Sequence, residues 1–403
     1  MEWIEGGVTA AAGFKASGIH CGIRKNKDKK DLSLIVSDRP CAAACCYTQN
    51  LVQGAPIHVT KENVKNGYAQ AIICNSGNAN TCNPGGEEMA KNMCRLVEIG
   101  TGIKSDDVIV ASTGVIGQPL DIAPIQAGMP KLIAELSETG SSAAAEGIMT
   151  TDTVKKEFAV SFQIGGKTVK LGGISKGSGM IHPNMATMLC FLTTDAAITP
   201  KALQKALSAV VPDTFNMISI DGDTSTNDMV SVLASGAAEN PVIKGGAELD
   251  VFEDALKELL TALCRQMAKD GEGATKLMTC VVSGAKDKQT AKLAARSVVA
   301  SSLVKAMIFG ADANVGRVLC AVGYSGADVD VSKIAVTFVS RAGELPVCEN
   351  GCAIVFDEEK AKKLLTEDEI DILIELNAGD ATATAWGCDL TYDYVKINGD
   401  YRT

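Results

Sequence analysis

A single threonine stands where a segment rich in small residues meets an apolar run. The segment reads KGSGMIHPNMATMLCFLTTDA over residues 176–196, and Thr187 follows Ala186 directly before MLCF. Its glycines allow backbone angles closed to other residues, and its proline makes the preceding residue extended. An irregular segment that ends at a hydroxyl residue opening a buried strand is typical of a self-cleaving N-terminal nucleophile. The pattern also fits an ordinary strand-opening threonine, so these residues alone leave both interpretations open.

The nucleophile interpretation specifies a chemistry. The Oγ of Thr187 attacks the carbonyl of Ala186, an N→O acyl shift gives an ester, and hydrolysis of the ester frees a new α-amine. An α-amine has a pKa of about 7.7–8.0, so it is partly neutral near pH 7 and can take the proton from its own hydroxyl. The chain has 3 histidines, which makes another base scarce. This interpretation predicts cleavage into residues 1–186 and 187–403, the second chain beginning with its nucleophile, and the two chains forming one intertwined, two-lobed unit.

The expected secondary structure that must position this threonine consists of strands that come in pairs along the sequence, followed by helices. Strand-length apolar runs lie at residues 32–38, 70–76, 107–113, 216–223, 230–236, 277–284, 334–340 and 353–357, and a hairpin with a Gly-Gly turn at 157–173. Helices are expected at 199–211, 249–271 and 357–376. Thr199 is the expected N-cap of the first, with Pro200 at its first position. The second has an apolar stripe made of Val251, Leu256, Leu259, Leu260 and Leu263. Paired strands with helices outside predict an α/β (α+β) protein, an αββα-type sandwich with mixed or antiparallel sheets.

The composition limits the classes of function. The net charge is −10 and aromatic residues make up 4%, which argues against nucleic acid as a partner. The 14 cysteines are scattered without a CxxC pair, many of them in apolar runs, so we expect buried thiols and no metal site. We expect no signal peptide and no membrane-spanning segment, because the chain has neither the basic start nor the long apolar run that these need. A cytoplasmic protein fits these observations.

Several blocks of the sequence resemble the ArgJ family of glutamate N-acetyltransferases, also called ornithine acetyltransferases. The segment around Thr187 is similar to the family's processing site. The other similar blocks, in family order, are NSGNANTC (75–82), ASTGVIGQPL (111–120), IMTTDT (148–153), SIDGDTSTND (219–228) and KINGDYRT (396–403). The resemblance covers essentially the whole chain. It implies the ArgJ/DmpA-like architecture of N-terminal-nucleophile enzymes and cleavage between Ala186 and Thr187.

The resemblance also implies roles for individual residues. Thr187 is the nucleophile, and Thr113 and Gly114 form the oxyanion hole. The family's substrate contacts fall on Thr150, Lys176, Thr187, Glu272, Asn398 and Thr403. Among Thr150, Thr151 and Thr153, the choice of Thr150 rests only on its spacing to Lys176.

The activity implied by the resemblance is a ping-pong acetyl transfer in arginine biosynthesis. Thr187 takes the acetyl group from N2-acetyl-L-ornithine as an ester and passes it to L-glutamate. No cofactor is implied, and the residues leave open whether acetyl-CoA serves as a second donor. The implied assembly is an α2β2 heterotetramer of cleaved chains.

Each of these assignments has a plainer alternative. Gly114 fits a tight turn, Lys176 a solvated loop, Glu272 an exposed helix end, and Asn398 with its following glycine a routine turn. A hydrolytic N-terminal-nucleophile amidase or aminopeptidase, a nucleotide or metal protein, and an uncleaved paralogue without activity are the rival classes. The block DANVGR (312–317) departs from the family's usual DPNWGR, so Ala313 and Val315 put substrate preference or assembly in question.

Overall fold

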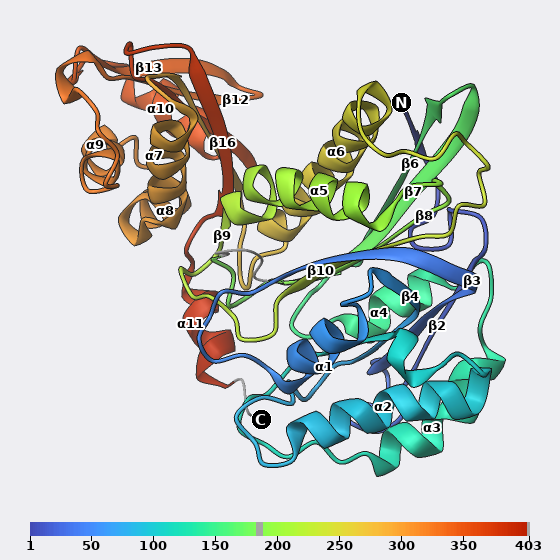
Figure 1. Cartoon of the computed structure of the whole chain (residues 1–403). Helices are drawn as coiled ribbons and strands as arrows, with labels where there is room; N and C mark the ends of the chain where they lie inside the picture. Colours follow the sequence, from blue (N-terminus) through green and yellow to red (C-terminus); the bar gives the residue numbers. More distant parts are fainter. Residues whose placement is uncertain (183–187, 401–403) are drawn as a thin grey trace. The chain divides into compact units, whose positions relative to one another are not determined.

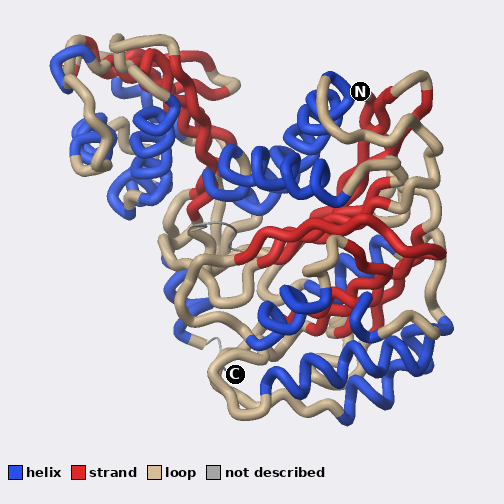
Figure 2. Tube along the Cα trace, viewed as in Figure 1, coloured by secondary structure: helices blue, strands red, loops and turns tan. Residues whose placement is uncertain are grey.

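The computed structural model describes residues 1–182 and 188–400 of the chain. These residues form two compact units, each built from several stretches of sequence. Unit 1 comprises Met1–Gly177, Asn184–Pro212 and Thr224–Leu263, and unit 2 comprises Ser178–Pro183, Asp213–Asp223 and Cys264–Thr403. Each unit has its own sheet. The secondary structure of the described residues is coloured in Figure 2.

Unit 1 is built on a mixed sheet of nine strands within the described residues. The strands are β1 (Glu2–Ile4), β2 (Phe14–Ile19), β3 (Leu32–Tyr47), β4 (Tyr68–Asn75), β5 (Val108–Ser112), β6 (Lys156–Ile164), β7 (Lys167–Lys176), β8 (Leu189–Thr194) and β10 (Met229–Ala234). They follow the order β1-β6-β7-β8-β10-β3-β4-β5, and β2 also pairs with β3. The β8–β10 and β4–β5 pairs are parallel and the others antiparallel.

The long strand β3 divides this sheet into two layers. Its residues 32–37 pair with β2, its residues 42–47 pair with β10, and its register with β4 shifts between Val36 and Cys41. One buried cluster joins side chains of β2, β4 and β5 to side chains of β7, β8 and β10, including Ile72, Ile174 and Phe191. The two halves of the sheet therefore pack face to face with a shared core between them (Figure 1).

Helices cover the outer faces of both layers. Those of unit 1 are α1 (Ala55–Asn63), α2 (Gly86–Thr101), α3 (Ala123–Ala134), α4 (Ser141–Ile148), α5 (Pro200–Val210) and α6 (Ala247–Lys269), whose last turn belongs to unit 2. A second cluster packs α2 and α3 on the outside of β2–β5, while α4 contributes to the core between the layers. On the other side, Phe252 of α6 stacks edge-on against Phe162 of β6. The expected αββα sandwich with mixed sheets is confirmed.

The sequence predictions for two helices of this unit hold except at one position. Thr199 caps α5 as expected, because its side chain accepts a hydrogen bond from the N–H of Ala202. The predicted stripe on α6 is buried at its four leucines, but Val251 is 42% exposed, so its assignment to the core was wrong. It lies at the end of the stripe and borders a surface pocket.

The β6–β7 hairpin delivers Lys176 to the middle of the sheet. Its turn is the predicted Gly165-Gly166 pair, and both glycines have the positive φ that this tight turn requires. The register then places Lys176, the last residue of β7, opposite Leu189 at the start of β8. Leu189 in turn pairs with Met229 of β10. The end of β7 and the start of β10 therefore lie on either side of β8, the strand that follows residue 187.

Unit 2 contains a seven-stranded mixed sheet in its described part, in the order β14-β13-β12-β15-β11-β16-β9. Its strands are β9 (Ile218–Ser219), β11 (Leu277–Ala285), β12 (Ala335–Ser340), β13 (Gly343–Glu349), β14 (Cys352–Ala353), β15 (Glu369–Glu375) and β16 (Ala381–Cys388). Its helices are α7 (Lys288–Ala300), α8 (Ser302–Phe309), α9 (Val315–Gly323), α10 (Glu358–Leu365) and α11 (Tyr392–Gly399). Helix α7 packs against β11 and β16. Short 3₁₀ turns of the chain lie at Ser105–Asp107, Val211–Asp213, Phe215–Met217 and Val331–Lys333.

The helix expected over residues 357–376 is wrong in its second half. Helix α10 ends at Leu365, and β15 begins at Glu369. In β15 the alternate residues Ile370, Ile372 and Ile374 are buried, which is the two-residue period of a strand covered on one face. The exposed Leu373 between Ile372 and Ile374 hides that alternation in the sequence, so the segment looks like an apolar helix face.

All fourteen cysteines are described and none forms a disulfide; ten of them are buried. Within the described residues, no helix is both long and apolar enough to cross a bilayer.

Candidate functional site

Thr113 and Gly114 lie just beyond β5, and each carries one hydrogen-bond donor that no described residue accepts. The N–H of Thr113 bonds to the carbonyl of Asn75 at 3.0 Å, so this amide is occupied. No described residue accepts a hydrogen bond from the Thr113 hydroxyl or from the N–H of Gly114. Gly114 has φ +127°, and a Cβ at this position would lie 2.4 Å from the carbonyl carbon of Gly77. Only glycine fits this close approach, so the turn interpretation of Gly114 is confirmed, and its oxyanion role stays a prediction.

A network of buried side-chain amides fixes the loop that carries these donors. Asn227 donates to the carbonyls of Ala79 and Ser112, at 2.6 and 2.9 Å, and accepts from the hydroxyl of Thr81. The Ser112 hydroxyl donates to Asn75 Oδ1 at 2.6 Å. In the sequence these residues stand out only as parts of the family blocks. The cluster of asparagines in NSGNAN was the available signal, since buried amides need partners and so tie loops together.

Lys176 is buried, with 8% of its surface exposed, and it is not a solvated loop residue. In the described part of the chain, no carboxylate lies within ion-pair distance of its Nζ. A buried ammonium is costly unless an anion meets it. An anionic ligand is therefore the partner that Lys176 is suited to bind.

Asp152 links Lys176 to Thr150. Its Oδ1 accepts from the N–H of Gly177 at 2.7 Å and from Lys156 Nζ at 2.6 Å, and its Oδ2 accepts from the N–H of Thr150 at 3.0 Å. Burial raises the pKa of this carboxyl, but Lys156, Lys176 and the hydrogen bonds outweigh it and hold the pKa well below its usual range. Two predicted site residues of unit 1 are thus brought together by an ionised residue that sequence reasoning missed.

Arg24 supports the same loop, since its guanidinium donates to the carbonyls of Met149 and Thr150 at 2.8 and 3.0 Å. The backbone of Thr150 is therefore held on both sides. This geometry does not decide among Thr150, Thr151 and Thr153, and the choice of Thr150 stays a prediction.

Asp228 is a second buried carboxyl, placed directly before β10. Burial raises its pKa well above the usual range, against the opposing effects of Ser225, Lys176 and Thr48. Its Oδ2 has no hydrogen-bond partner among the described residues. Sequence reasoning did not single it out, although an acid directly before the apolar run MVSVLA was a visible signal.

In unit 2 the structure brings Glu272 and Asn398 together. Asn398 Nδ2, on α11, donates to Glu272 Oε2 at 2.7 Å. Glu272 has 8% of its surface exposed, which excludes an exposed helix end. A Cβ at Gly179 would lie 2.4 Å from Glu272 Cδ, so the carboxylate packs against the segment that precedes the predicted cleavage site. The glycine at this position is required for that contact.

Asp221 and His182 also belong to this part of unit 2, and sequence reasoning assigned neither to the site. Asp221 accepts from the backbone N–H groups of Met180 and Ile181. His182 Nδ1 lies 3.0 Å from Ser219 Oγ. Burial and the nearby Arg296 lower the pKa of His182 to about 4, with Asp221 opposing them, so the imidazole is neutral at pH 7.

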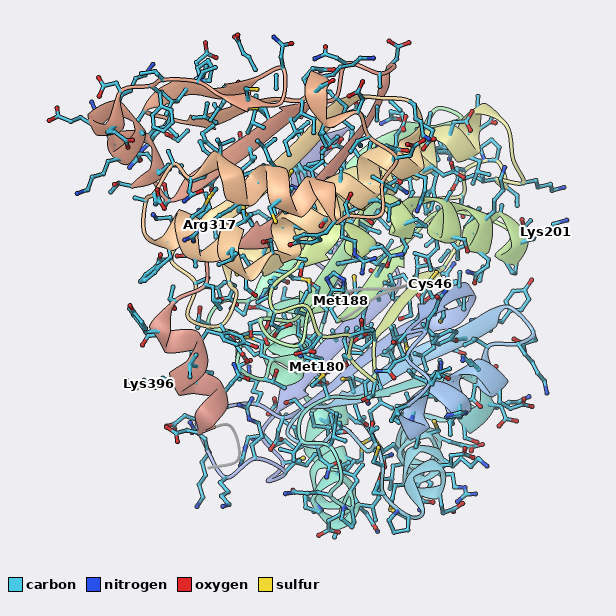
Figure 3. All side chains as sticks on the ribbon, turned by 90° about the vertical axis from the view of Figure 1, so that its left-hand side faces the viewer. Cys46, Met180, Met188, Lys201, Arg317 and Lys396 are labelled. Atoms are coloured by element: carbon cyan, nitrogen blue, oxygen red, sulfur yellow. The ribbon has the colours of Figure 1, made fainter. Side chains whose placement is uncertain are left out.

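Ala186, Thr187 and Thr403 lie outside the described residues, so their predicted roles stay predictions. His182 is the last described residue before that gap, and Met188, labelled in Figure 3, is the first after it. Thr113, Gly114, Thr150 and Lys176 are described within unit 1, and Glu272 and Asn398 within unit 2.

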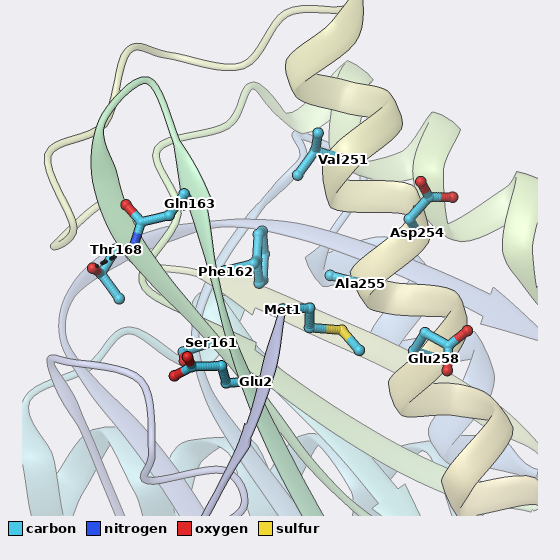
Figure 4. Close-up of a pocket in the computed structure, with 10 residues that line it drawn as sticks. All are labelled: Met1, Glu2, Ser161, Phe162, Gln163, Thr168, Val251, Asp254, Ala255 and Glu258. Carbon is cyan, nitrogen blue, oxygen red and sulfur yellow. Dashed lines mark hydrogen bonds between the residues drawn. The ribbon is translucent and has the colours of Figure 1, made fainter.

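Other features of the described residues do not add to the site. A pocket between β6 and α6, drawn in Figure 4, contains none of the predicted residues and is lined in part by Glu2, Asp254 and Glu258. Its volume is about 540 Å³. No three His, Cys, Asp or Glu side chains of the described chain are placed to hold a metal ion. Ala313 and Val315, the departures from the family pattern, are buried at the start of α9.

Comparison with known proteins gives one consistent result. Residues 15–403 match the model of the ArgJ family. The chain is 51% identical to the arginine biosynthesis bifunctional protein ArgJ of Symbiobacterium thermophilum over 100% of both chains, and 46% identical to that of Bacillus subtilis over 99% of this chain and 97% of the relative.

Two solved structures are also similar. The ArgJ protein of Bacillus halodurans shares 46% identity with a TM-score of 0.49, covering 51% of this chain and 96% of that one. The ornithine acetyltransferase of Mycobacterium tuberculosis, complexed with ornithine, shares 35% identity with a TM-score of 0.41, covering 45% and 96%. On the family match and the identity to its full-length relatives, the chain belongs to the ArgJ family.

Proposed function

We propose that this protein is a glutamate N-acetyltransferase of arginine biosynthesis, which moves the acetyl group of N2-acetyl-L-ornithine to L-glutamate. The observation that carries the proposal is Lys176, a buried lysine with no described carboxylate within ion-pair distance, beside the strand that follows Thr187. Both substrates present an α-carboxylate that such a cation can bind. Glu272, a buried carboxylate, suits the ammonium group of ornithine.

The reaction begins with maturation of the chain. Thr187 Oγ attacks the carbonyl carbon of Ala186, the peptide C–N bond breaks, and water hydrolyses the resulting ester. The products are a carboxylate on Ala186 and a free α-amine on Thr187. That amine then serves as the general base for the Thr187 hydroxyl.

Acetyl transfer follows in two steps. Thr187 Oγ attacks the acetyl carbonyl, the proton passes through the α-amine to the leaving nitrogen, and ornithine departs. The amine of glutamate then attacks the acetyl ester, the C–O bond breaks, and the hydroxyl regains its proton. The Gly114 N–H and the Thr113 hydroxyl are the donors that we assign to the oxyanion, since the Thr113 amide is already occupied by Asn75.

The fate of the acetyl group tests this function against hydrolysis. Purified protein is incubated with N2-acetylornithine, with and without glutamate. A transferase forms N-acetylglutamate in step with ornithine, whereas an amidase releases acetate whether or not glutamate is present. A parallel assay with acetyl-CoA as the sole donor shows whether it is a second substrate.

We further propose that cleaved protomers pair as α2β2 in the cytoplasm. Native mass measurement of the mature protein tests the assembly. Two copies of each chain per particle support it, and a single pair contradicts it.

Replacing Gly114 by alanine is expected to lower kcat strongly. The new Cβ meets the backbone at Gly77 and the φ of +127° is unfavourable for alanine, so the loop shifts and its donors move. Loss of one oxyanion donor costs about 10²–10³-fold in kcat. Gly117→Ala is the matched control: Gly117 has φ +81°, but a Cβ there meets nothing within 4 Å, so kcat should stay within about twofold.

Replacing Lys176 by methionine is expected to act on substrate binding. Loss of a charge-assisted hydrogen bond of about 1.5–3 kcal/mol raises KM for both substrates by roughly 10- to 100-fold. Lys167→Met, at the exposed start of the same strand, is the control and should leave both KM values unchanged. An unchanged KM in the Lys176 variant would exclude this lysine from the carboxylate site.

A further inference from the structure

A short stretch before the proposed cleavage site belongs to unit 2. Unit 2 consists otherwise of residues 213–223 and residues from 264 onward, all of which come after residue 187. Residues 178–182 are therefore the only described part of residues 1–186 that this unit contains.

Five contacts hold this stretch to the rest of unit 2. The Ser178 carbonyl accepts from the N–H of Glu272 at 2.8 Å, and the Ile181 carbonyl accepts from the N–H of Ile220 at 2.7 Å. The N–H groups of Met180 and Ile181 donate to Asp221 Oδ2 and Oδ1 at 2.6 and 2.9 Å, and His182 meets Ser219 at 3.0 Å. The side chain of Ile181 is 1% exposed. The stretch is thus fixed at consecutive residues.

Asp221 is the central group among these contacts. Its Oδ2 accepts the N–H of Met180 and the hydroxyl of Tyr394 at 3.2 Å, and its Oδ1 accepts the N–H of Ile181 and, at 3.3 Å, the N–H of Asp223 in its own loop. Hydrogen bonds to an ionised acceptor are about twice as strong as neutral ones. Burial and Asp221 raise the pKa of Tyr394, which keeps its hydroxyl protonated and donating. Tyr394 lies on α11, the helix that also carries Asn398.

The backbone that Asp221 holds is not relaxed. Met180, labelled in Figure 3, has φ +54°, a left-handed conformation that costs a non-glycine residue roughly 1 kcal/mol or more. Such a conformation persists only where surrounding contacts impose it. The paired acceptance by one carboxylate imposes it here.

We propose that Asp221 is a positioning residue for self-cleavage, which clamps the chain entering the scissile bond through the amides of Met180 and Ile181. The inference rests on the proposed function, because it assumes the cut between Ala186 and Thr187. Intramolecular attack requires the carbonyl to be presented at a fixed place, and a small misplacement costs about 10²-fold in rate. After cleavage, the same contacts hold the C-terminal end of the first chain within unit 2, whose other described residues all belong to the second chain.

The test compares a graded series of variants. Asp221→Ala removes the clamp, Asp221→Asn keeps its shape but can accept only one of the two amides, and Tyr394→Phe removes only the hydroxyl. Asp223→Ala, an exposed carboxylate in the same loop, is the matched control. Val282→Ala, in the buried face of β11, supplies a destabilised unit 2 with the clamp intact.

Two measurements are made on each variant. The rate of conversion of precursor into two chains is followed on denaturing gels, well below the unfolding temperature. Hydrogen exchange at the amides of Met180 and Ile181 is followed in a Thr187→Ala background, where cleavage does not contribute.

The expected result is a graded loss. Asp221→Ala slows cleavage by about 10- to 100-fold, Asp221→Asn by less, and Tyr394→Phe least. The two amides lose protection in the same order. Asp223→Ala and Val282→Ala cleave at the wild-type rate and retain that protection.

Two results overturn the clamp: wild-type cleavage by Asp221→Ala, or slowing by Val282→Ala as large as that by Asp221→Ala, which would reduce Asp221 to a stabilising role. If the wild-type chain is never cut, the proposed function fails, while the exchange series still decides whether Asp221 holds these amides.

Discussion

A Thr187→Ala chain is expected to remain a single polypeptide of 41.9 kDa and to transfer no acetyl group above background. Alanine has no hydroxyl to attack the preceding carbonyl, and without cleavage no α-amine is formed. Loss of a covalent nucleophile in a comparable acyl-transfer enzyme lowers kcat by about 10⁶-fold. A denaturing gel and an assay with acetylornithine and glutamate measure both effects on the same preparation.

Thr187→Ser is the matched comparison, because its hydroxyl can attack the same carbonyl. It should mature into two chains and retain activity at an altered rate. Mass spectrometry of the wild-type enzyme, quenched with acetylornithine alone, should find one acetyl group on the new N-terminal residue of the second chain. Normal turnover by the alanine variant, or an acetyl group on another side chain, would contradict the mechanism.

Asp152→Ala is expected to have the largest effect on stability. It removes the ion-pair partner of Lys156, whose side chain is fully buried, and breaking a buried pair in this way costs roughly 3–5 kcal/mol. It also frees the backbone at Thr150 and Gly177, so KM should rise in the molecules that remain folded. Urea unfolding gives the first quantity and steady-state kinetics the second.

Two further variants distinguish the loss of the Asp152–Lys156 ion pair from the effect on the substrate site. Asp152→Ala combined with Lys156→Met should be more stable than Asp152→Ala alone, because the double variant no longer buries a lysine that has lost the Asp152 carboxylate. Lys155→Met removes an exposed contact with Glu146 and should cost at most about 1 kcal/mol. Equal stability of Asp152→Ala and the wild type would contradict the assigned pairing.

The pH dependence of the wild type follows from the same carboxyl. Its pKa is lowered in the folded chain, so its contribution to the free energy of unfolding is complete above the unfolded pKa of about 3.9 and is lost as the pH falls through the folded value. Between about pH 5 and 3, the stability of the wild type should therefore fall more steeply than that of the double variant.

The fold was predictable where local patterns agree with tertiary burial. The Gly165-Gly166 hairpin and the Thr199 cap are set by their own backbone requirements, and both are confirmed. Residues 366–376 were misassigned because the exposed Leu373 interrupts the apolar–polar alternation of β15, and only pairing with β11 and β12 reveals the strand. The division of the nine strands of unit 1 into two layers depends on the path of β3, which no local pattern encodes.

The sequence offered the family-matched residues as candidates for the site, and their roles stay predictions; it did not reveal the groups that hold them. The burial of Lys176 and the Glu272–Asn398 contact fit the roles taken from the resemblance. Asp152 and Asp221 were missed because each acts on backbone amides of a segment 25 to 41 residues away. A carboxylate in a loop looks the same in the sequence whether it faces water or such an amide.

The burial of the cysteines determines which thiols react with thiol-directed reagents. Ten of the fourteen cysteines are buried, and burial raises the pKa of several of them, to about 12 for Cys45, so little thiolate forms there near neutral pH. The exposed thiols are Cys82, Cys320 and Cys352. A maleimide dye is therefore expected to react at three cysteines, one before residue 187 and two after it. One labelling reaction then marks both chains of a cleaved molecule.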